Sequence, residues 1–153
     1  MKQKQALDVL KAGKNVYLTG AAGSGKTHVL NQYVSYIKER GVPIAVTAST
    51  GIAATHLGGV TLHSWSGVGV RDALSLAELE ALEQKEYLWK RFEKTKILVI
   101  DEVSMLSPRL FDTVERICRT MKRIDMPFGG MQIVLAGDFF QLPPITRGST
   151  ATE

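Results

Sequence analysis

The sequence predicts an α/β domain built on a parallel β-sheet with helices on both faces. The first observation is a set of four short, continuous apolar runs, which is typical of strands buried on both faces. The second is that helical patterns separate these runs, so that strands and helices alternate. The third is a glycine-rich turn directly after the first run. The four runs are residues 16–19, 44–48, 97–101 and 132–136.

Two helices are predicted from apolar residues spaced three and four apart. The first follows the glycine-rich turn and should end at Gly41. The second should begin with Ser107 as N-cap and Pro108 in its first turn, and its apolar face should extend to Ile124. The charged stretch 71–96 has no strand pattern, and we expect one or two surface helices inserted there.

Length and composition are those of one soluble globular domain. The chain has 153 residues, of which 44% are hydrophobic and 22% charged, which excludes a mainly disordered chain. No apolar run approaches the ~18 residues of a membrane span, and a signal peptide is lacking, so a cytoplasmic protein is expected, nucleoid-associated in a bacterium. The single cysteine, Cys118, excludes an internal disulfide and a multi-cysteine zinc site. A net charge of +4 allows a polyanionic partner without requiring one.

A segment of the form G-x-x-x-x-G-K-[ST] lies between the first predicted strand and the first predicted helix. In this context glycines let the backbone wrap around phosphates, and successive N–H groups point at the anion. Lys26 should reach the β- and γ-phosphates, and Thr27 should ligate Mg²⁺. The competing interpretation is a chance glycine-rich turn. The segment consists of Gly20, Ala21, Ala22, Gly23, Ser24, Gly25, Lys26 and Thr27.

Two adjacent carboxylates end the third apolar run, at the sheet edge where open α/β sheets bind ligands. Asp101 should hold Mg²⁺ through water, because this ion keeps several of its waters. Glu102 is the natural general base, which orients and deprotonates an attacking water. The alternative is that the two carboxylates cap the next helix.

A polar amide, Gln141, follows the fourth apolar run and is the best candidate for sensing a γ-phosphate. A loop hydrogen bond is the alternative role for Gln141. Phosphate-linked movement there would reach Phe139 and Phe140, although core packing is the favoured interpretation for these two rings.

Five motifs occur along the chain in the order GAAGSGKT, TASTGIAA, TLHSWSG, DEVSML and GDFFQLPP. Together they resemble the Pif-one family of superfamily-one DNA helicases, close to the RecD-type helicases. The resemblance extends over residues 3–145, and TASTGIAA with GDFFQLPP is its most specific part. It implies a RecA-like P-loop NTPase fold and an ATP-driven, Mg²⁺-dependent motor. Such motors move 5′ to 3′ along single-stranded DNA and unwind duplexes, and several also act on G-quadruplexes and RNA–DNA hybrids.

The resemblance assigns further binding residues. It implies that an N-terminal glutamine reads the adenine: Gln3 has the expected spacing from the phosphate loop, and Gln5 is a close competitor. It also implies that residues 47–54 contact DNA, with Thr50 and Gly51 as the favoured contacts. Hydroxyl and backbone donors to phosphate position a strand without reading its sequence.

The TLHSWSG segment resembles a second DNA-contacting segment of the family. His63 would donate to DNA, with a capped structural histidine as an equal alternative. Trp65 would stack on a base, although core packing is favoured. Cys118 should be a buried small hydrophobe. Basic residues near the C-terminus of the same helix should mainly complement its dipole; they are Arg116, Arg119, Lys122 and Arg123.

Family motors bind ATP between two RecA-like domains, and the resemblance covers only the first. We therefore expect residues 1–153 to be a first motor domain that lacks the second domain's arginine finger. Such fingers are worth ~10³–10⁵ in rate, so this chain alone should bind nucleotide, as a monomer, without efficient turnover. Two alternatives remain: a non-helicase P-loop ATPase such as a helicase or clamp loader, and a non-catalytic nucleotide-binding module.

Overall fold

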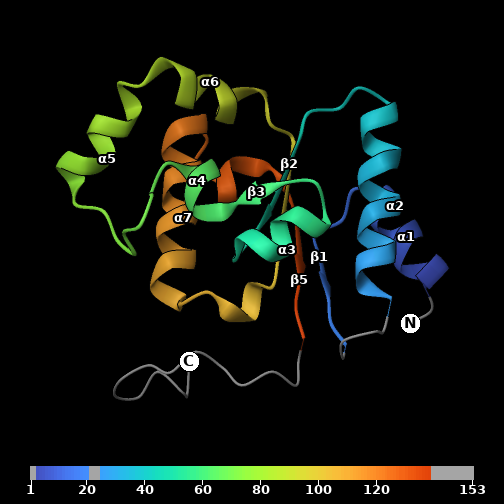
Figure 1. Cartoon of the computed structure of the whole chain (residues 1–153). Coiled ribbons are helices and arrows are strands. Elements are labelled where there is room, and N and C mark those ends of the chain that lie inside the picture. The colour runs from blue at the N-terminus through green and yellow to red at the C-terminus, as the bar shows by residue number, and fades with distance from the viewer. Residues whose placement is uncertain (1–2, 21–24, 139–153) are drawn as a thin grey trace.

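The computed structural model describes residues 3–20 and 25–138 (Figure 1). Within these ranges, five parallel strands form one sheet in the order β1-β5-β4-β2-β3. The predicted parallel α/β class is confirmed. The strands are β1 (Val16–Leu18), β2 (Ile44–Ala48), β3 (Val60–Thr61), β4 (Ile97–Asp101) and β5 (Gln132–Ala136). β3 was not predicted, because two residues are too few to form a pattern.

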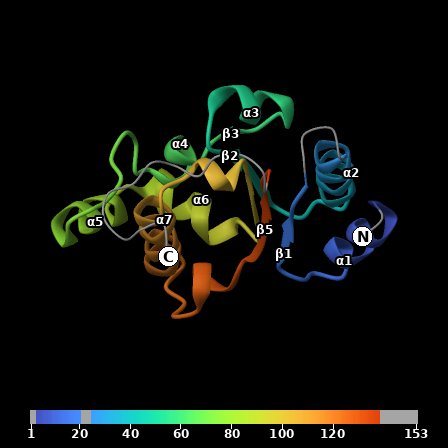
Figure 2. The ribbon, with the colours of Figure 1, turned by 90° about the horizontal axis from the view of Figure 1, so that it is seen from below.

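Helices cover both faces of this sheet (Figure 2). α1 and α2 lie on one face and share a core with Val99 and Val134. α4 to α7 lie on the opposite face, over a core that includes Leu98 and Ile100. The α-helices are α1 (Gln3–Lys11), α2 (Lys26–Glu39), α3 (Gly51–His56), α4 (Leu62–Ser66), α5 (Leu76–Glu83), α6 (Glu86–Lys94) and α7 (Pro108–Lys122). Short 3₁₀ turns form η1 (Val103–Met105) and η2 (Pro127–Gly130).

Side chains of β4 alternate between the two cores, which explains why this strand is a continuous apolar run. β1 departs from that pattern, because Tyr17 is 48% exposed. β1 is an edge strand of the described sheet, so the expectation that it is covered on both faces was wrong. No helix in the described part of the chain has the length and apolar character needed to cross a membrane.

The predicted helix boundaries hold at three of their four ends. α2 ends at Glu39, and Gly41 follows with φ +72°, a conformation that favours glycine. The Ser107 hydroxyl accepts a hydrogen bond of 3.1 Å from the Leu110 backbone N–H and so caps α7. The expected extension of α7 to Ile124 was wrong. Arg123 adopts the left-handed conformation and ends the helix, leaving Ile124 42% exposed.

The strand order decides which loops meet at the carboxyl edge of the sheet. β5 lies between β1 and β4, and the Gly137 backbone N–H donates to the Leu18 carbonyl at 3.0 Å. On the other side of β4, the Ser49 backbone N–H donates to the Asp101 carbonyl at 3.1 Å. The segments that follow β1, β5, β4 and β2 are therefore neighbours at this edge, although they are far apart in sequence.

Candidate active site

The phosphate-loop segment joins β1 to α2, and its residues 21–24 lie outside the described residues. Gly20 and Gly25, on either side, have φ values of +142° and +94°, which favour glycine. Lys26 is the first residue of α2, and its ammonium donates to the Gly20 carbonyl. The N-terminus of α2, with its orphan N–H groups, therefore lies beside Gly20, and a helix N-terminus favours a bound anion.

Gln3 lies directly beside this helix terminus. A Cβ atom at position 25 would collide with the Gln3 Nε2 atom. The Gln3 amide therefore occupies the space above Gly25, next to Lys26. Gln5 lies two residues further along α1 and is exposed. Position favours Gln3 over Gln5 as the glutamine that meets a bound nucleotide.

Asp101 ends β4, and its carboxylate accepts a hydrogen bond of 2.8 Å from the Glu102 backbone N–H. Burial raises the pKa of the Asp101 carboxyl, and the negative charge of Glu102 raises that pKa further. The hydrogen bond from the Glu102 N–H and the charges of Lys26 and His56 oppose this rise in pKa. Burial disfavours the charged form of Asp101, and a cation bound nearby would stabilise that charged form.

Thr27 and Asp101 suit a Mg²⁺ ion bound together with a nucleotide phosphate. Thr27 is the second residue of α2, next to Lys26. Mg²⁺ is usually held by one or two carboxylates, with water and phosphate oxygens completing its coordination. One hydroxyl and one half-buried carboxylate match that requirement. Within residues 3–20 and 25–138, no group of three or more His, Cys, Asp or Glu could hold a metal ion.

Glu102 connects the nucleotide side of the site to the expected DNA-contacting loop. Its backbone is left-handed, with φ 53° and ψ 41°. Its Oε1 atom accepts hydrogen bonds from the Thr50 hydroxyl at 2.9 Å and the Ser49 hydroxyl at 3.2 Å. Thr50 also caps α3, since its hydroxyl oxygen accepts a bond from the Ala53 N–H at 3.2 Å. Thr50 and Gly51 are exposed at the start of this helix.

The second expected DNA segment is mostly structural. Trp65 is 6% exposed, and its ring centroid lies 4.5 Å from that of Phe92. Core packing is therefore confirmed for Trp65, and base stacking by this side chain was wrong. His63 is half-buried in α4, and its backbone carbonyl accepts a bond of 3.1 Å from Gly69. A DNA contact by the His63 ring stays a prediction.

The predictions for Phe139, Phe140 and Gln141 fall outside the described residues. The described residues end at Asp138, two residues after β5. Because β5 lies between β1 and β4, the chain leaves this strand between the phosphate loop and Asp101.

Comparison with known proteins agrees with this geometry. The family model of the PIF1-like helicase matches residues 1–153. The ATP-dependent DNA helicase Pif1 of Psychrobacter sp. (strain PRwf-1) is 54% identical over 151 residues. The chain belongs to the PIF1-like helicase family. The ATP-dependent DNA helicase PIF1 of Homo sapiens is 40% identical over 147 residues.

Solved PIF1-family structures share the fold. The Pif1 helicase of Candida albicans has a TM-score of 0.86 and 36% identity, covering 94% of this chain and 33% of that one. The Bacteroides Pif1 helicase in complex with ADP-AlF3 and single-stranded DNA has a TM-score of 0.79 and 38% identity, covering 98% and 34%. The Psychrobacter and human matches cover 98% and 96% of this chain, but 23% and 22% of those proteins. The chain thus spans about a quarter of its curated relatives.

Two residues of this candidate site were not predicted from the sequence. Ser49 donates to Glu102, and His56 is close enough to influence the pKa of Asp101. The signal for Ser49 is a pair of hydroxyls directly after one buried strand and a pair of carboxylates directly after another. That signal becomes informative only once β2 and β4 are known to be adjacent.

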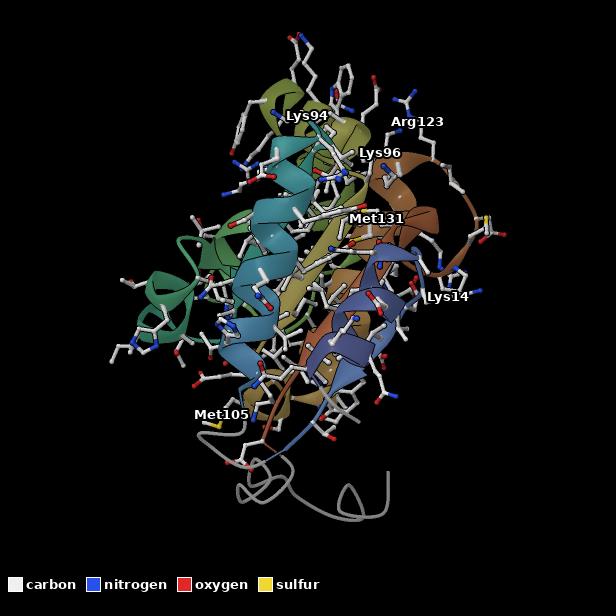
Figure 3. All side chains as sticks on the ribbon, turned by 90° about the vertical axis from the view of Figure 1, so that its right-hand side faces the viewer. Lys14, Lys94, Lys96, Met105, Arg123 and Met131 are labelled. Atoms are coloured by element: carbon white, nitrogen blue, oxygen red, sulfur yellow. The ribbon has the colours of Figure 1, made fainter. Side chains whose placement is uncertain are left out.

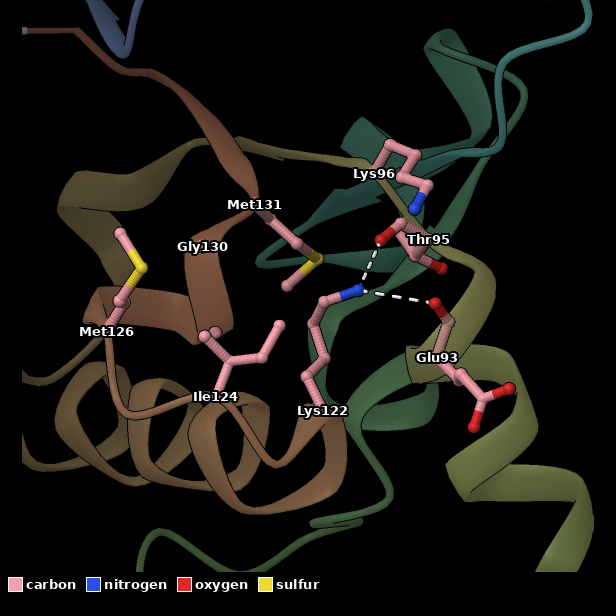
Figure 4. Close-up of a pocket in the computed structure, with 9 residues that line it drawn as sticks. Glu93, Thr95, Lys96, Lys122, Ile124, Met126, Gly130 and Met131 are labelled. Carbon is pink, nitrogen blue, oxygen red and sulfur yellow. Dashed lines mark hydrogen bonds between the residues drawn. The ribbon is translucent and has the colours of Figure 1, made fainter.

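The basic residues of α7 make contacts outside the candidate site, and Lys122 does so at the opposite, amino edge of the sheet, just before β4. Figure 3 shows Lys94, Lys96 and Arg123 at that edge, and Met105 at the carboxyl edge. Arg116 donates to the Leu74 carbonyl at 2.8 Å, and Arg119 pairs with Glu115 and Asp125. Lys122 donates to the backbone carbonyls of Phe92, Glu93 and Thr95, at and just after the end of α6. Figure 4 shows the bonds to Glu93 and Thr95. Arg116 and Lys122 thus also hydrogen-bond other segments, a role that was not predicted, while Lys122 stands in the last turn of α7, where its charge suits the helix dipole.

Cys118 is buried in the core under α7, as predicted, and burial raises the pKa of its thiol. A thiol with a raised pKa is a poor nucleophile at neutral pH. Cys118 therefore contributes packing and not chemistry.

Proposed function

We propose that this chain is the first RecA-like motor domain of an ATP-dependent DNA helicase, a domain that binds MgATP at the carboxyl edge of its sheet. The observation that carries the proposal is the pair of hydrogen bonds from Ser49 and Thr50 to Glu102. These bonds join a residue expected to contact DNA to the residue expected to act as the base, which supports a domain that couples DNA to ATP. The Bacteroides relative in complex with ADP-AlF3 and single-stranded DNA supports both ligand classes.

In this function Gln3 hydrogen-bonds the adenine, and residues 20–27 surround the phosphates. Lys26 turns from the Gly20 carbonyl to the β- and γ-phosphates. Thr27 and Asp101 hold Mg²⁺, which neutralises phosphate charge when bound. Gln141 senses the γ-phosphate. Glu102 accepts a proton from the attacking water, whose oxygen bonds to the γ-phosphorus as the bond to the leaving ADP oxygen breaks.

The DNA side consists of the Thr50 hydroxyl, the Gly51 backbone N–H and the His63 ring. These groups bind phosphates of a single strand without reading sequence, so affinity should fall steeply with salt. Unwinding of duplexes or G-quadruplexes, 5′-to-3′ movement and a monomeric state belong to the proposal for the full-length protein. A second domain would supply the arginine that neutralises the transition state.

The test compares residues 1–153 with the full-length protein in ATPase and strand-displacement assays. The short chain should bind MgATP but hydrolyse it near background, because a missing arginine costs ~10³–10⁵ in rate. The full-length protein should show hydrolysis stimulated by single-stranded DNA, and unwinding.

Robust DNA-stimulated hydrolysis by the short chain would contradict the two-domain proposal. An arginine within residues 1–153, Arg71 or Arg147, would then have to act from a neighbouring copy. The structure opposes this role for Arg71, whose Nη1 lies 2.8 Å from Glu78 Oε2 and whose Nε donates to the Val68 carbonyl. Arg147 lies outside the described residues.

A further inference from the structure

The Glu102 carboxylate is hydrogen-bonded on the side away from the phosphate loop. In the sheet, the strand leading to that loop, β1, is separated from β4 by β5, whereas β2 lies on the other side of β4. Both hydroxyls that donate to Glu102 follow β2 directly, at Ser49 and Thr50. They act on the same atom, Oε1, whose two lone pairs they fill. The expected base is therefore turned toward the DNA loop.

The Thr50 hydroxyl cannot serve Glu102 and a DNA phosphate at once. A hydroxyl has one hydrogen to donate, and phosphate oxygens only accept. That hydrogen points at Glu102, while the oxygen accepts from the Ala53 N–H. A phosphate bound by the Thr50 hydroxyl must take the hydrogen and would bring a negative charge near the Glu102 carboxylate. Both effects drive Glu102 away from β2.

We propose that Ser49 and Thr50 restrain Glu102 on the β2 side, and that a DNA phosphate on Thr50 releases it to activate water. This inference rests on the proposed helicase function. Ser49 acts through Glu102 and is a positioning residue, not a catalytic one. The arrangement makes ATP hydrolysis depend on DNA through two hydrogen bonds, without a long-range conformational change.

The test is steady-state ATPase kinetics of the full-length protein, with and without single-stranded DNA. Ser49→Ala removes one restraint and should raise the DNA-free kcat about three- to tenfold, tenfold being the rate equivalent of about 1.4 kcal/mol. The KM for ATP and the DNA-saturated kcat should stay unchanged, so the stimulation ratio falls. Ser49→Thr keeps the hydroxyl and should behave as wild type.

Thr55 provides the matched control. Its hydroxyl is exposed on α3 and donates to the Gly51 carbonyl at 2.9 Å, not to Glu102. Thr55→Ala should leave the DNA-free kcat unchanged. Adding Glu102→Gln to Ser49→Ala should abolish the raised DNA-free rate, which would assign that rate to Glu102.

The experiment distinguishes a failure of the proposed helicase function from a failure of the proposed restraint on Glu102. A wild-type protein that DNA does not stimulate would contradict the helicase function itself. A stimulated wild type in which Ser49→Ala leaves the DNA-free kcat unchanged or lowers it would overturn the restraint. A raised rate that survives Glu102→Gln would overturn it as well.

Discussion

Partly buried charged side chains lie at both edges of the sheet, of opposite sign and with different kinds of partner. At the amino edge, the Lys122 ammonium donates to three backbone carbonyls at 2.7, 2.9 and 3.4 Å, and Figure 4 shows the bonds to Thr95 and Glu93. At the carboxyl edge, Glu102 accepts from two side-chain hydroxyls, and Asp101 accepts from one backbone N–H. Burial shifts the pKa of Lys122 down and that of Asp101 up, so the charged form is disfavoured at both edges.

The hydrogen-bonding partners determine which of these charged side chains is fixed in the folded domain and which can change partner when a ligand binds. Carbonyls at and just after the end of α6 cannot move without disturbing that end of the helix, so Lys122 is fixed for as long as the domain is folded. A serine or threonine hydroxyl rotates about one bond and can exchange one acceptor for another. The carboxyl edge is therefore built from interactions that a ligand can replace, and the amino edge from interactions that it cannot.

The largest expected effect comes from replacing one glutamate at each edge, Glu102 at the carboxyl edge and Glu93 at the amino edge, and comparing the two variants. Glu102→Gln in the full-length protein should lower kcat by about 10²–10⁴, because it removes a general base, and should leave ATP affinity intact. Glu93→Gln, at the amino edge, should change neither, since Glu93 lies outside the candidate site and Lys122 hydrogen-bonds its backbone carbonyl, which the substitution keeps. The measurement is DNA-stimulated kcat together with calorimetric ATP binding. A Glu102→Gln protein that unfolds would show that this carboxylate is structural.

Replacing Lys26 should affect nucleotide binding, whereas replacing Lys122 should affect the stability of the fold. Lys26→Ala in residues 1–153 should abolish calorimetric MgATP binding and leave thermal stability nearly unchanged, since its described bond is to one loop carbonyl. Lys122→Ala should do the reverse and lower the free energy of unfolding by about 1–3 kcal/mol, the cost of removing a charged hydrogen-bond donor. Equal nucleotide affinity in Lys26→Ala would contradict the site assignment.

Local sequence pattern predicted most of the fold. The runs at 44–48, 97–101 and 132–136 match their strands, because a short, continuous apolar stretch between two turns is typical of a strand buried on both faces. Local pattern failed where an element depends on another segment or on the backbone conformation of a single residue. β3 exists only by pairing with Thr47 and Ala48. The end of α7 depends on the left-handed backbone of Arg123, and a left-handed residue is hard to predict where it is not a glycine.

The candidate site was predictable to a similar extent. Motif spacing located Lys26 and Asp101, since each is fixed by the end of a single strand or the start of a single helix. Ser49 was missed because its role requires the order of β2 and β4, which is a property of the whole sheet. Core packing was rightly favoured for Trp65, but its partner, Phe92 from α6, could not be seen in the TLHSWSG motif.

The Asp101 carboxyl at the carboxyl edge should make the stability of the domain depend on pH. Because its pKa is raised in the folded state, the native protein binds this proton more tightly than the unfolded chain does. Stability therefore falls as pH rises from the ordinary carboxyl range through the raised pKa, and the ionised Asp101 costs stability at neutral pH. Asp101→Asn should be more stable than wild type at pH 7, and the difference should shrink on acidification. Chemical denaturation at several pH values measures it.

The same substitution should remove the benefit of Mg²⁺. Wild-type residues 1–153 should bind ATP more tightly with Mg²⁺ than without, and Asp101→Asn should show little difference, because Asp101 is the described carboxylate that suits the ion. An Asp101→Asn protein that is less stable than wild type at pH 7, yet keeps its Mg²⁺ dependence, would make Asp101 a structural residue like Lys122.

The smallest expected effect concerns the adenine, where two glutamines of α1 compete. The Gln3 amide lies over Gly25 at the start of α2, beside the expected nucleotide site, whereas Gln5 lies two residues further along α1. Gln3→Ala should reduce the preference for ATP over GTP by about two- to tenfold, the effect of one neutral hydrogen bond. Gln5→Ala is the matched control and should keep that preference. Competition binding of the two nucleotides to residues 1–153 measures both variants. The opposite result, with selectivity lost only in Gln5→Ala, would mean that the base lies further along α1 than Gly25 indicates, because a single amide cannot reach both positions.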